Sequence, residues 1–224
     1  MSTKSFLHNV VFVIPTMNNT EGLKDLLGDL STGYQEAKVV LVNNSRASLH
    51  QKLDISSFNL QIMVLDQGKN TGFAKACNDG AEIARGQGNP EHLIFLNDDI
   101  RFTTEWVSEC LETMKRKKWF ATTPLLKRPA GELENMGYKV LPEGKIKLLS
   151  KDSDGSIDGL TAAALVIRTK DFFSMKGFDE RFFAYLEDVD LFLRAKKNGK
   201  KFGVSSDCFV IHQGQGTSSK MKPF

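Results

Sequence analysis

The stretch that decides the fold is Leu93-Ile94-Phe95-Leu96-Asn97-Asp98-Asp99. Four apolar residues that stop at two acids are typical of a buried strand whose carboxyl end opens on a cleft. Carboxylates at such a place are costly to bury unless a cation or hydrogen-bond donors meet them. Taken alone, the stretch is compatible with a ligand site, and also with a solvated turn that caps the next helix.

Three similar apolar runs precede this stretch, and polar residues follow each of them. The runs are 10–14, followed by Pro15 and Thr16; 39–42, followed by Asn43, Asn44 and Ser45; and 62–65, followed by Asp66. Between them, leucines at 23, 26, 27 and 30 and small residues over 73–84 recur at helical spacing. Asn18 and Glu21 resemble a capping pair for the first helix. Strands that alternate with helices in units of about 30 residues predict a parallel sheet with right-handed crossovers.

The same pattern limits the ligands that the sheet can hold. The chain has neither a GxGxxG nor a GxxxxGK sequence, so the loops that hold dinucleotides or ATP-type phosphates are not expected. Ligands of parallel sheets bind beyond the carboxyl ends of the strands, and here those ends are all polar. We therefore expect a Rossmann-like sheet with its site at this edge.

The regular alternation ends after Asp99. We expect a helix over 105–117, a strand over 120–126, an exposed hairpin-like segment over 131–149, a turn at Asp154-Gly155 and a buried run over 160–167. Residues 177–190 combine aromatic side chains with acids. A helix over 189–194, with Phe192 and Leu193 buried, follows them, and a last strand over 201–210 precedes His212.

The totals exclude several classes of protein. A formal charge of +3 on 224 residues is too small to suggest a nucleic-acid partner. Cys77, Cys110 and Cys208 lack the CxxC spacing of a zinc site. Their odd number, without a signal peptide, predicts a cytoplasmic protein rather than a disulfide framework. No run approaches the ~20 apolar residues of a membrane-spanning helix. A partner or a tail beyond this sequence could still hold the protein peripherally at the inner face of a membrane.

Four stretches carry a family resemblance, and His212 follows them. They are Val13-Ile-Pro-Thr16, Asn70-Thr-Gly-Phe-Ala-Lys-Ala-Cys-Asn78, Leu96-Asn-Asp-Asp99 and Gly177-Phe-Asp-Glu-Arg-Phe-Phe-Ala-Tyr-Leu-Glu-Asp-Val-Asp-Leu-Phe-Leu-Arg194. In this order they resemble the family 2 glycosyltransferases, in particular the bacterial branch with rhamnosyltransferase-like enzymes of cell-surface polysaccharide synthesis. The resemblance implies the α/β GT-A fold, with a Rossmann-like, mostly parallel central sheet, helices on both faces and a smaller acceptor-side α+β half. We expect one domain over 1–224, with a nucleotide-binding half over about 8–100 and an acceptor-side half over about 101–216.

The resemblance also implies the reaction. It is a metal-dependent, inverting transfer of a sugar from a UDP or dTDP donor to a hydroxyl of a saccharide or lipid-linked saccharide acceptor. A departing diphosphate calls for a divalent cation. Asp99 is the carboxylate that we expect to bind it, and His212 is the second ligand that the resemblance implies. An oxygen and imidazole set with open positions suits Mn²⁺ and tolerates Mg²⁺.

The acceptor hydroxyl needs a carboxylate base, and Asp188 fits because it stands just before a helix with Glu187 beside it. Like charges raise the pKa of a carboxyl while a helix N-terminus lowers it, and the sequence leaves this balance open. The structural alternative is that these acids, with Asp190 as the capping member, stabilise the helix start. Phe182, Phe183 and Tyr185 are compatible with stacking on acceptor sugars and equally with the core.

The donor is expected to meet polar groups at the strand ends and in the 70–78 segment. Asn43 or Asn44 could accept a hydrogen bond from a pyrimidine N3–H, and Asn97 or Asp98 could bind ribose hydroxyls. The expected donor-binding residues are Pro15, Thr16, Asn18, Asn43, Asn44, Asn70, Lys75, Asn97 and Asp98.

Two other functions stay open. A sugar nucleotidyltransferase shares the sheet and the paired acids, although Thr16-Met-Asn-Asn-Thr20 lacks the glycine-rich, basic loop usual in such enzymes. A non-catalytic domain that binds nucleotide sugars or scaffolds a synthesis complex is suggested by Asn43 and Asn97, where the family usually has Asp. The presence of Asp99, Asp188 and His212 together argues for an enzyme.

Overall fold

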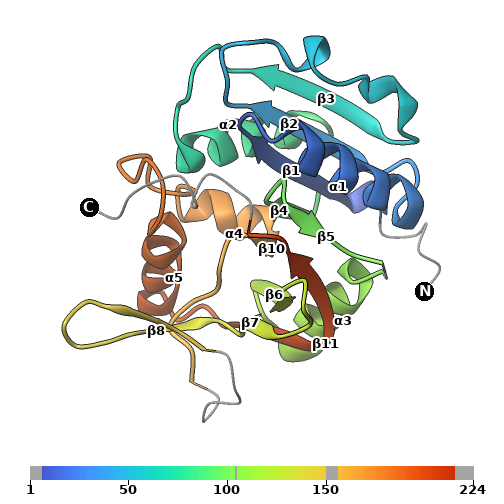
Figure 1. The fold of residues 1–224 in the computed structure, drawn as a ribbon. Helices are drawn as coiled ribbons and strands as arrows, with labels where there is room; N and C mark the ends of the chain where they lie inside the picture. The colour runs from blue at the N-terminus through green and yellow to red at the C-terminus, as the bar shows by residue number, and fades with distance from the viewer. Residues whose placement is uncertain (1–6, 104, 150–155, 215–224) are drawn as a thin grey trace.

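The computed structural model describes residues 7–103, 105–149 and 156–214. Within them a nine-stranded sheet has the order β3-β2-β1-β4-β10-β6-β11-β5, with β7 paired to β6, and β8 and β9 form a separate two-stranded sheet. In Figure 1 the N-terminal half, coloured blue to green, lies above the C-terminal half. The expected turn at Asp154-Gly155 and the end of the acceptor-side half, residues 215–216, fall outside the described residues.

The N-terminal half is the expected alternation of strands and helices. It contains η2 (Leu7–Asn9), β1 (Val10–Thr16), α1 (Thr20–Gly33), β2 (Lys38–Asn43), η3 (Leu49–Gln51), η4 (Ile55–Ser57), β3 (Gln61–Asp66), α2 (Phe73–Gly86) and β4 (His92–Leu96). The strands β3, β2, β1 and β4 are parallel neighbours, and Thr16 pairs with Asn43, which pairs with Asp66. The polar strand ends therefore meet at one edge, as the sequence predicted.

Helices cover both faces of this sheet. The leucines of α1 pack with Phe12 and Ile14 on one face, and the small residues of α2 pack with Val11 and Val13 on the other. Gly80 allows the close approach of α2, because a Cβ there would lie 2.5 Å from Cγ1 of Val13. The strict alternation of side chains 10–14 of β1 between two apolar layers explains why this part of the strand is uniformly apolar.

The C-terminal half completes the sheet with mixed strand directions. It contains β5 (Ile100–Arg101), α3 (Val107–Lys117), β6 (Ala121–Lys127), β7 (Leu133–Asn135), β8 (Tyr138–Val140), β9 (Ile146–Leu148), β10 (Ala164–Arg168), α4 (Thr169–Ser174), α5 (Glu187–Lys197) and β11 (Phe202–His212). Strand β10 runs antiparallel to both β4 and β6 and so joins the two halves. Strand β11 pairs with β5, which sets His212 opposite Ile100, one residue beyond Asp99.

Three local expectations were wrong. The residue that caps α1 is Asn19, whose side chain accepts the N–H of Gly22, while Asn18 has a left-handed backbone with φ of 60°. Helix α5 begins at Glu187, two residues early. Leu193 is 42% exposed, because α5 presents Leu191, Phe192 and Ala195 to the core instead.

Among the described residues, no helix combines the length and apolarity needed to cross a membrane.

Candidate active site

A cleft of about 430 Å³ lies at the carboxyl ends of the parallel strands. It gathers residues from β1, the β4–β5 turn, β7, β8, the start of α5 and the end of β11. Most of the residues singled out from the sequence line it, and Asn18, Asn43 and Lys75 do not. The lining residues from that set are Pro15, Thr16, Asn44, Asn70, Asn97, Asp98, Asp99, Glu187, Asp188 and His212.

Asp98 is held by hydrogen-bond donors from the first strand and helix. Oγ1 of Thr16 donates to Oδ2 of Asp98 at 2.6 Å, and Nδ2 of Asn19 donates to Oδ1 at 3.0 Å. Burial raises the pKa of Asp98 to about 6 in spite of these bonds. Asp98 thus ties the end of β4 to the end of β1 and the start of α1, so it shapes the cleft floor.

Asp99 meets an imidazole that arrives from the far end of the chain. Nε2 of His212 lies 3.3 Å from Oδ1 of Asp99, and Nδ1 of His212 lies 3.0 Å from Oε2 of Glu134. The backbone N–H of Gln213 also donates to the carbonyl of Asp99 at 3.0 Å, which fixes the strand end against the turn. One imidazole is therefore clamped between two carboxylates at the cleft wall.

The charges of Asp99 and Glu134 dominate the protonation of His212. Burial by itself lowers the pKa of His212, but the hydrogen bonds and charges of Asp99 and Glu134 outweigh burial and raise it to about 9. Asp99 itself is 3% exposed and Asp98 9% exposed, so two neighbouring carboxylates are buried here. Such a concentration of negative charge favours a bound cation.

The donor set fits a cation that shares its coordination with a substrate. Asp99 would supply an oxygen and His212 a nitrogen, a mixed set that suits Mn²⁺ and tolerates Mg²⁺. Asn97 lines the same cleft, and its side-chain oxygen Oδ1 is buried with no hydrogen-bond partner in the part of the chain that the structure describes. Over 7–103, 105–149 and 156–214, no group of three or more His, Cys, Asp or Glu is arranged to hold a metal ion. Phosphate oxygens of a substrate and water would complete the coordination of such a cation.

The second pair of acids stands at the start of α5. Tyr185 and Leu186 have left-handed backbones, with φ of 67° and 68°, and this costly turn leads directly into Glu187 and Asp188. Asp188 accepts the N–H of Ala162 at 3.2 Å through Oδ2 and the N–H of Val189 at 2.8 Å through Oδ1. The strained turn and these two bonds direct the Asp188 carboxylate to the cleft, in which it is a lining residue.

The two acids have different environments. Burial, and then the charge of Asp188, raise the pKa of Glu187 to about 8. Oε2 of Glu187 has no hydrogen-bond partner among the described residues. Burial also raises the pKa of Asp188, but its two backbone N–H donors favour the ionised form. Burial therefore wins, for both acids, the balance that the sequence left open. Glu187 holds its proton near pH 7, which leaves Asp188 as the member suited to accept one.

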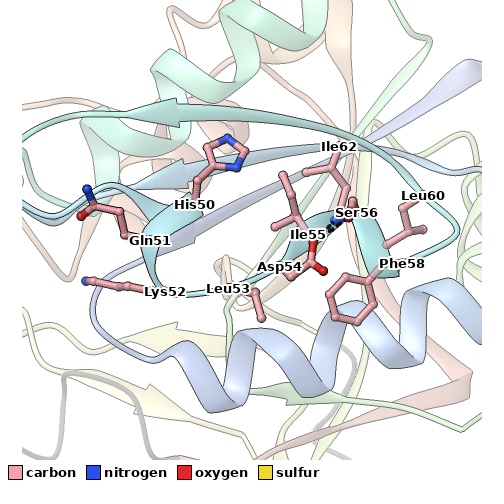
Figure 2. Close-up of a pocket in the computed structure, with 10 residues that line it drawn as sticks. All are labelled: His50, Gln51, Lys52, Leu53, Asp54, Ile55, Ser56, Phe58, Leu60 and Ile62. Carbon is pink, nitrogen blue, oxygen red and sulfur yellow. Dashed lines mark hydrogen bonds between the residues drawn. The ribbon is translucent and has the colours of Figure 1, made fainter.

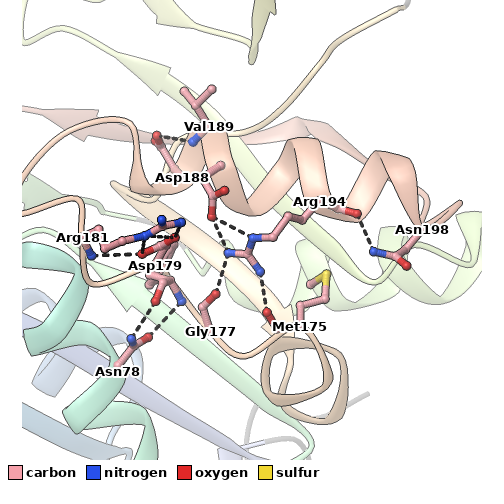
Figure 3. Close-up of polar contacts among 11 residues, drawn as sticks. Asn78, Met175, Gly177, Asp179, Arg181, Asp188, Val189, Arg194 and Asn198 are labelled. Carbon is pink, nitrogen blue, oxygen red and sulfur yellow. Dashed lines mark hydrogen bonds and ion pairs between the residues drawn. The ribbon is translucent and has the colours of Figure 1, made fainter.

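A network of polar contacts holds the loop before these acids (Figure 3). Arg194 of α5 donates to the carbonyls of Met175 and Gly177 and pairs with Asp190 at 2.7 Å. Asp190 therefore binds an arginine and does not cap the helix. Asn78 of α2 accepts the N–H of Phe178 at 3.0 Å and donates to its carbonyl at 2.8 Å. These contacts thus hold residues 175–178 against α5 and α2.

The same loop closes onto α2 at a glycine. The N–H of Phe73 donates to the carbonyl of Phe183 at 2.7 Å. A Cβ at Gly72, whose φ is +89°, would lie 2.4 Å from that carbonyl oxygen. Only glycine fits this contact without displacing the loop, which gives the Asn70-Thr-Gly-Phe stretch a structural role beside its expected place at the donor.

Several expected donor residues have their polar groups engaged within the protein. Asn43 donates to the carbonyl of Ala47 and to Asp66, and Ser45 donates to Asn43 Oδ1. Asn44 is occupied by Thr71 and the carbonyl of Gly72. Lys75 pairs with Asp79 at 2.9 Å, and Asn18 accepts from Lys52 at 3.0 Å. Their assignment to the nucleotide stays a prediction, and Asn97 is better placed.

Two residues of the cleft went unnoticed in the sequence. Glu134 lies on a three-residue strand. Tyr138 is 2% exposed, and its hydroxyl has no hydrogen-bond partner within 7–103, 105–149 and 156–214. Both fall in the segment expected to be an exposed hairpin, whose pattern carries no signal for either. The mouth of the cleft beside them is apolar. Its exposed side chains are Leu148, Phe183, Tyr185 and Leu186, about half of whose surface is accessible.

A larger hollow lies away from these residues (Figure 2). It measures about 850 Å³ and is lined by residues 50–56, 58, 60 and 62, around η3, η4 and the start of β3. Asp54 within it is occupied by the N–H and hydroxyl of Ser56. None of the expected site residues lines this hollow, so the smaller cleft is the candidate active site.

Comparisons with known proteins point to one family. The family model described as Glycosyl transferase family 2 matches residues 11–172. Rhamnosyltransferase WbbL of Escherichia coli (strain K12) is 23% identical over 221 residues, which cover 91% of this chain and 83% of WbbL. O-antigen biosynthesis protein RfbC of Myxococcus xanthus is 26% identical over 226 residues, which cover 91% of this chain but 17% of RfbC.

Solved structures share the fold at low identity. S. aureus TarS 1-349 superposes with a TM-score of 0.64 at 19% identity, over 92% of this chain and 60% of that one. GalNAc-T7, solved with UDP, GalNAc and Mn²⁺, gives 0.70 at 13% identity, over 92% of this chain and 44% of that one. The chain spans most of WbbL but less than two thirds of RfbC, TarS 1-349 and GalNAc-T7.

Proposed function

The chain belongs to glycosyl transferase family 2, and from this membership we propose a metal-dependent, inverting transfer of a sugar. The donor is a UDP or dTDP sugar, and the acceptor is a hydroxyl of a saccharide or a lipid-linked saccharide. The observation that carries the proposal is that one cleft brings together Asp99 with His212 and, from another element, Asp188. Asp99 and His212 suit a diphosphate with its cation, and Asp188 suits an acceptor hydroxyl.

On the donor side, three residues have proposed roles. Asp99 and His212 would hold Mn²⁺ or Mg²⁺. Oδ1 of Asn97 has no hydrogen-bond partner among the described residues, so it can accept a hydrogen bond from a ribose hydroxyl. The bound cation would neutralise the charge that grows on the departing diphosphate. Asp98 contributes by holding β1, α1 and the β4–β5 turn in one arrangement.

On the acceptor side, Asp188 is the residue that takes the proton. As the acceptor oxygen forms its bond to the anomeric carbon, its proton moves to the Asp188 carboxylate, and the bond from that carbon to the diphosphate oxygen breaks. A single displacement of this kind inverts the anomeric carbon. The N–H groups of Ala162 and Val189 orient the carboxylate. Glu187, protonated near pH 7, can donate a hydrogen bond to the acceptor.

The surroundings and relatives support a role in polysaccharide synthesis. The relatives named rhamnosyltransferase WbbL and O-antigen biosynthesis protein RfbC suggest a rhamnosyl-type transfer in the assembly of a surface glycan. The exposed side chains of Leu148, Phe183, Tyr185 and Leu186 at the cleft mouth support an acceptor that carries an apolar group. Such an acceptor fits a protein that works in the cytoplasm, at the inner face of a membrane.

A transfer assay tests the proposal. The purified protein is incubated with Mn²⁺, lipid-linked or soluble saccharide acceptors, and UDP-, dTDP- and GDP-sugars, and the released nucleoside diphosphate is measured. We expect release from a UDP or dTDP donor, with inverted anomeric configuration in the product by NMR. Pyrophosphate release from a nucleoside triphosphate would instead identify a nucleotidyltransferase. Binding of a nucleotide sugar without transfer or hydrolysis would identify a binding domain.

A further inference from the structure

We propose that Glu134 is a positioning residue for His212: it accepts the Nδ1–H of the imidazole and thereby presents Nε2 to a cation shared with Asp99. The inference rests on the proposed function, because it concerns the cation of the donor site. It adds a residue that neither the sequence pattern nor the comparisons assign. The contact is between Oε2 of Glu134 and Nδ1 of His212, at 3.0 Å.

The sheet brings Glu134 to the imidazole through an irregular pairing. Strand β6 lies between β7, which carries Glu134, and β11, which ends at His212. Along β7, Asn135 pairs with Leu126 and Leu133 with Lys127, so the register shifts at the position of Glu134. Irregularities of this kind re-aim a side chain next to functional sites. Strands two apart are about 10 Å from each other, a span that a long carboxylate and an imidazole can bridge.

The two nitrogens of the ring have different partners. Nδ1 is 3.0 Å from Glu134 and Nε2 is 3.3 Å from Asp99, so the shorter contact falls on Glu134. Ionised carboxylates only accept hydrogen bonds, and a neutral imidazole has one N–H to give. With the Nδ1–H given to Glu134, Nε2, which faces Asp99, is the nitrogen that could bind a cation shared with Asp99. A carboxylate bound to the second nitrogen is the usual device that orients a metal-binding histidine.

Burial separates this contact from an ordinary surface ion pair. The side chains of His212, Glu134 and Asp99 are 20%, 22% and 4% exposed, and all three line the cleft. A partly buried contact of this geometry limits ring rotation, whereas fully exposed pairs contribute little. Glu134 is therefore expected to act through the orientation of His212 and not through direct contact with the substrate.

The experiment compares Glu134→Ala, Glu134→Gln and the control Glu132→Ala, which removes an exposed acid two residues away. Two properties are measured. The first is the tautomer of the His212 ring in metal-free protein, from its imidazole ¹⁵N shifts at a pH where the ring is neutral. The second is the affinity for Mn²⁺ in the presence of UDP or dTDP, from electron paramagnetic resonance.

Wild type and Glu132→Ala are expected to show the Nδ1–H tautomer and the same affinity. Glu134→Ala should shift the ring toward Nε2–H and weaken Mn²⁺ binding by roughly 10–100-fold, the usual effect of removing such a partner. Glu134→Gln keeps an acceptor oxygen and should restore the tautomer and most of the affinity. If Glu134→Ala does not fold, Glu134→Asp, which withdraws the carboxylate by one methylene, should show both losses.

An unchanged tautomer and unchanged Mn²⁺ affinity in Glu134→Ala would overturn the inference. Failure of the proposed function looks different, because wild type itself would then bind no Mn²⁺ with either nucleotide. In that case the tautomer still decides the role of Glu134: a shift in Glu134→Ala supports the positioning contact, and no shift refutes it.

Discussion

Replacement of Asp188 by Asn is expected to abolish most of the turnover while the donor still binds. Asn has nearly the same size but cannot take a proton from the acceptor hydroxyl. General-base catalysis contributes roughly 10²–10⁴-fold in rate, and each tenfold change corresponds to about 1.36 kcal/mol of activation free energy. The variant should therefore lose about 3–5 kcal/mol of transition-state stabilisation.

The structure indicates that this variant folds. Asp188 accepts the N–H of Ala162 and the N–H of Val189 through separate oxygens. Asn can satisfy one of them, and a lost hydrogen bond to a buried group costs about 1–3 kcal/mol of unfolding free energy. Burial disfavours the charge of Asp188, as its raised pKa shows, and the neutral amide relieves that cost. The net change in stability should be small.

The assay measures donor affinity by calorimetry and turnover by release of the nucleoside diphosphate, with circular dichroism as a control for folding. Glu187→Gln is the matched comparison, since Glu187 is already protonated near pH 7. Normal turnover in Asp188→Asn, or a dead Glu187→Gln beside an active Asp188→Asn, would show that the base is assigned to the wrong residue.

Three further outcomes are expected. Turnover should fall at acid pH as Asp188 is protonated. If the reaction uses the proton of Glu187, turnover should also fall above a pH of about 8, and Glu187→Gln should remove only this alkaline fall. A pH–rate profile measures both effects. In metal-free protein the pKa of His212 is raised from 6.5 to about 9. The free energy that protonated His212 contributes to folding is therefore present in full below pH 6.5 and is lost as the pH rises through 9. Denaturant unfolding of wild type against His212→Gln should show this loss, at most about 3 kcal/mol, and equal pH dependence in both proteins would refute it. Arg194→Ala should lower the unfolding free energy by about 2–4 kcal/mol, because the carbonyls of Met175 and Gly177 and the carboxylate of Asp190 lose their partner; a Tm within 1 °C or so of wild type would contradict this.

The sheet of the N-terminal half was predictable because its signals are local. Each of β1 to β4 is a short apolar run that stops at polar residues, and a parallel sheet places those ends at one edge. Asp98 and Asp99 therefore fell at the cleft as predicted. The capping residue was misplaced by one position, because Asn18 and Asn19 are both suitable caps and only the backbone distinguishes them.

The acceptor-side half was predictable mainly through the family resemblance. His212 reaches Asp99 through the pairing of β11 with β5, which lie more than 100 residues apart in the sequence, and no local pattern encodes such a pairing. Glu134 escaped notice because a three-residue strand has no periodicity to detect. Leu193 was misjudged because α5 is covered by the core on one narrow side.

The central claim is that Asp99 and His212 bind a nucleoside diphosphate together with a divalent cation. Calorimetric titration of UDP and dTDP into wild type, Asp99→Asn and Asp188→Asn, each with Mn²⁺ and with EDTA, tests it most directly. Wild type and Asp188→Asn should bind one of these nucleotides tighter with Mn²⁺ by about tenfold or more, equivalent to about 1.4 kcal/mol, and Asp99→Asn should lose that difference. Equal affinity in Mn²⁺ and EDTA for wild type, or an Mn²⁺ effect that survives in Asp99→Asn, would contradict the claim.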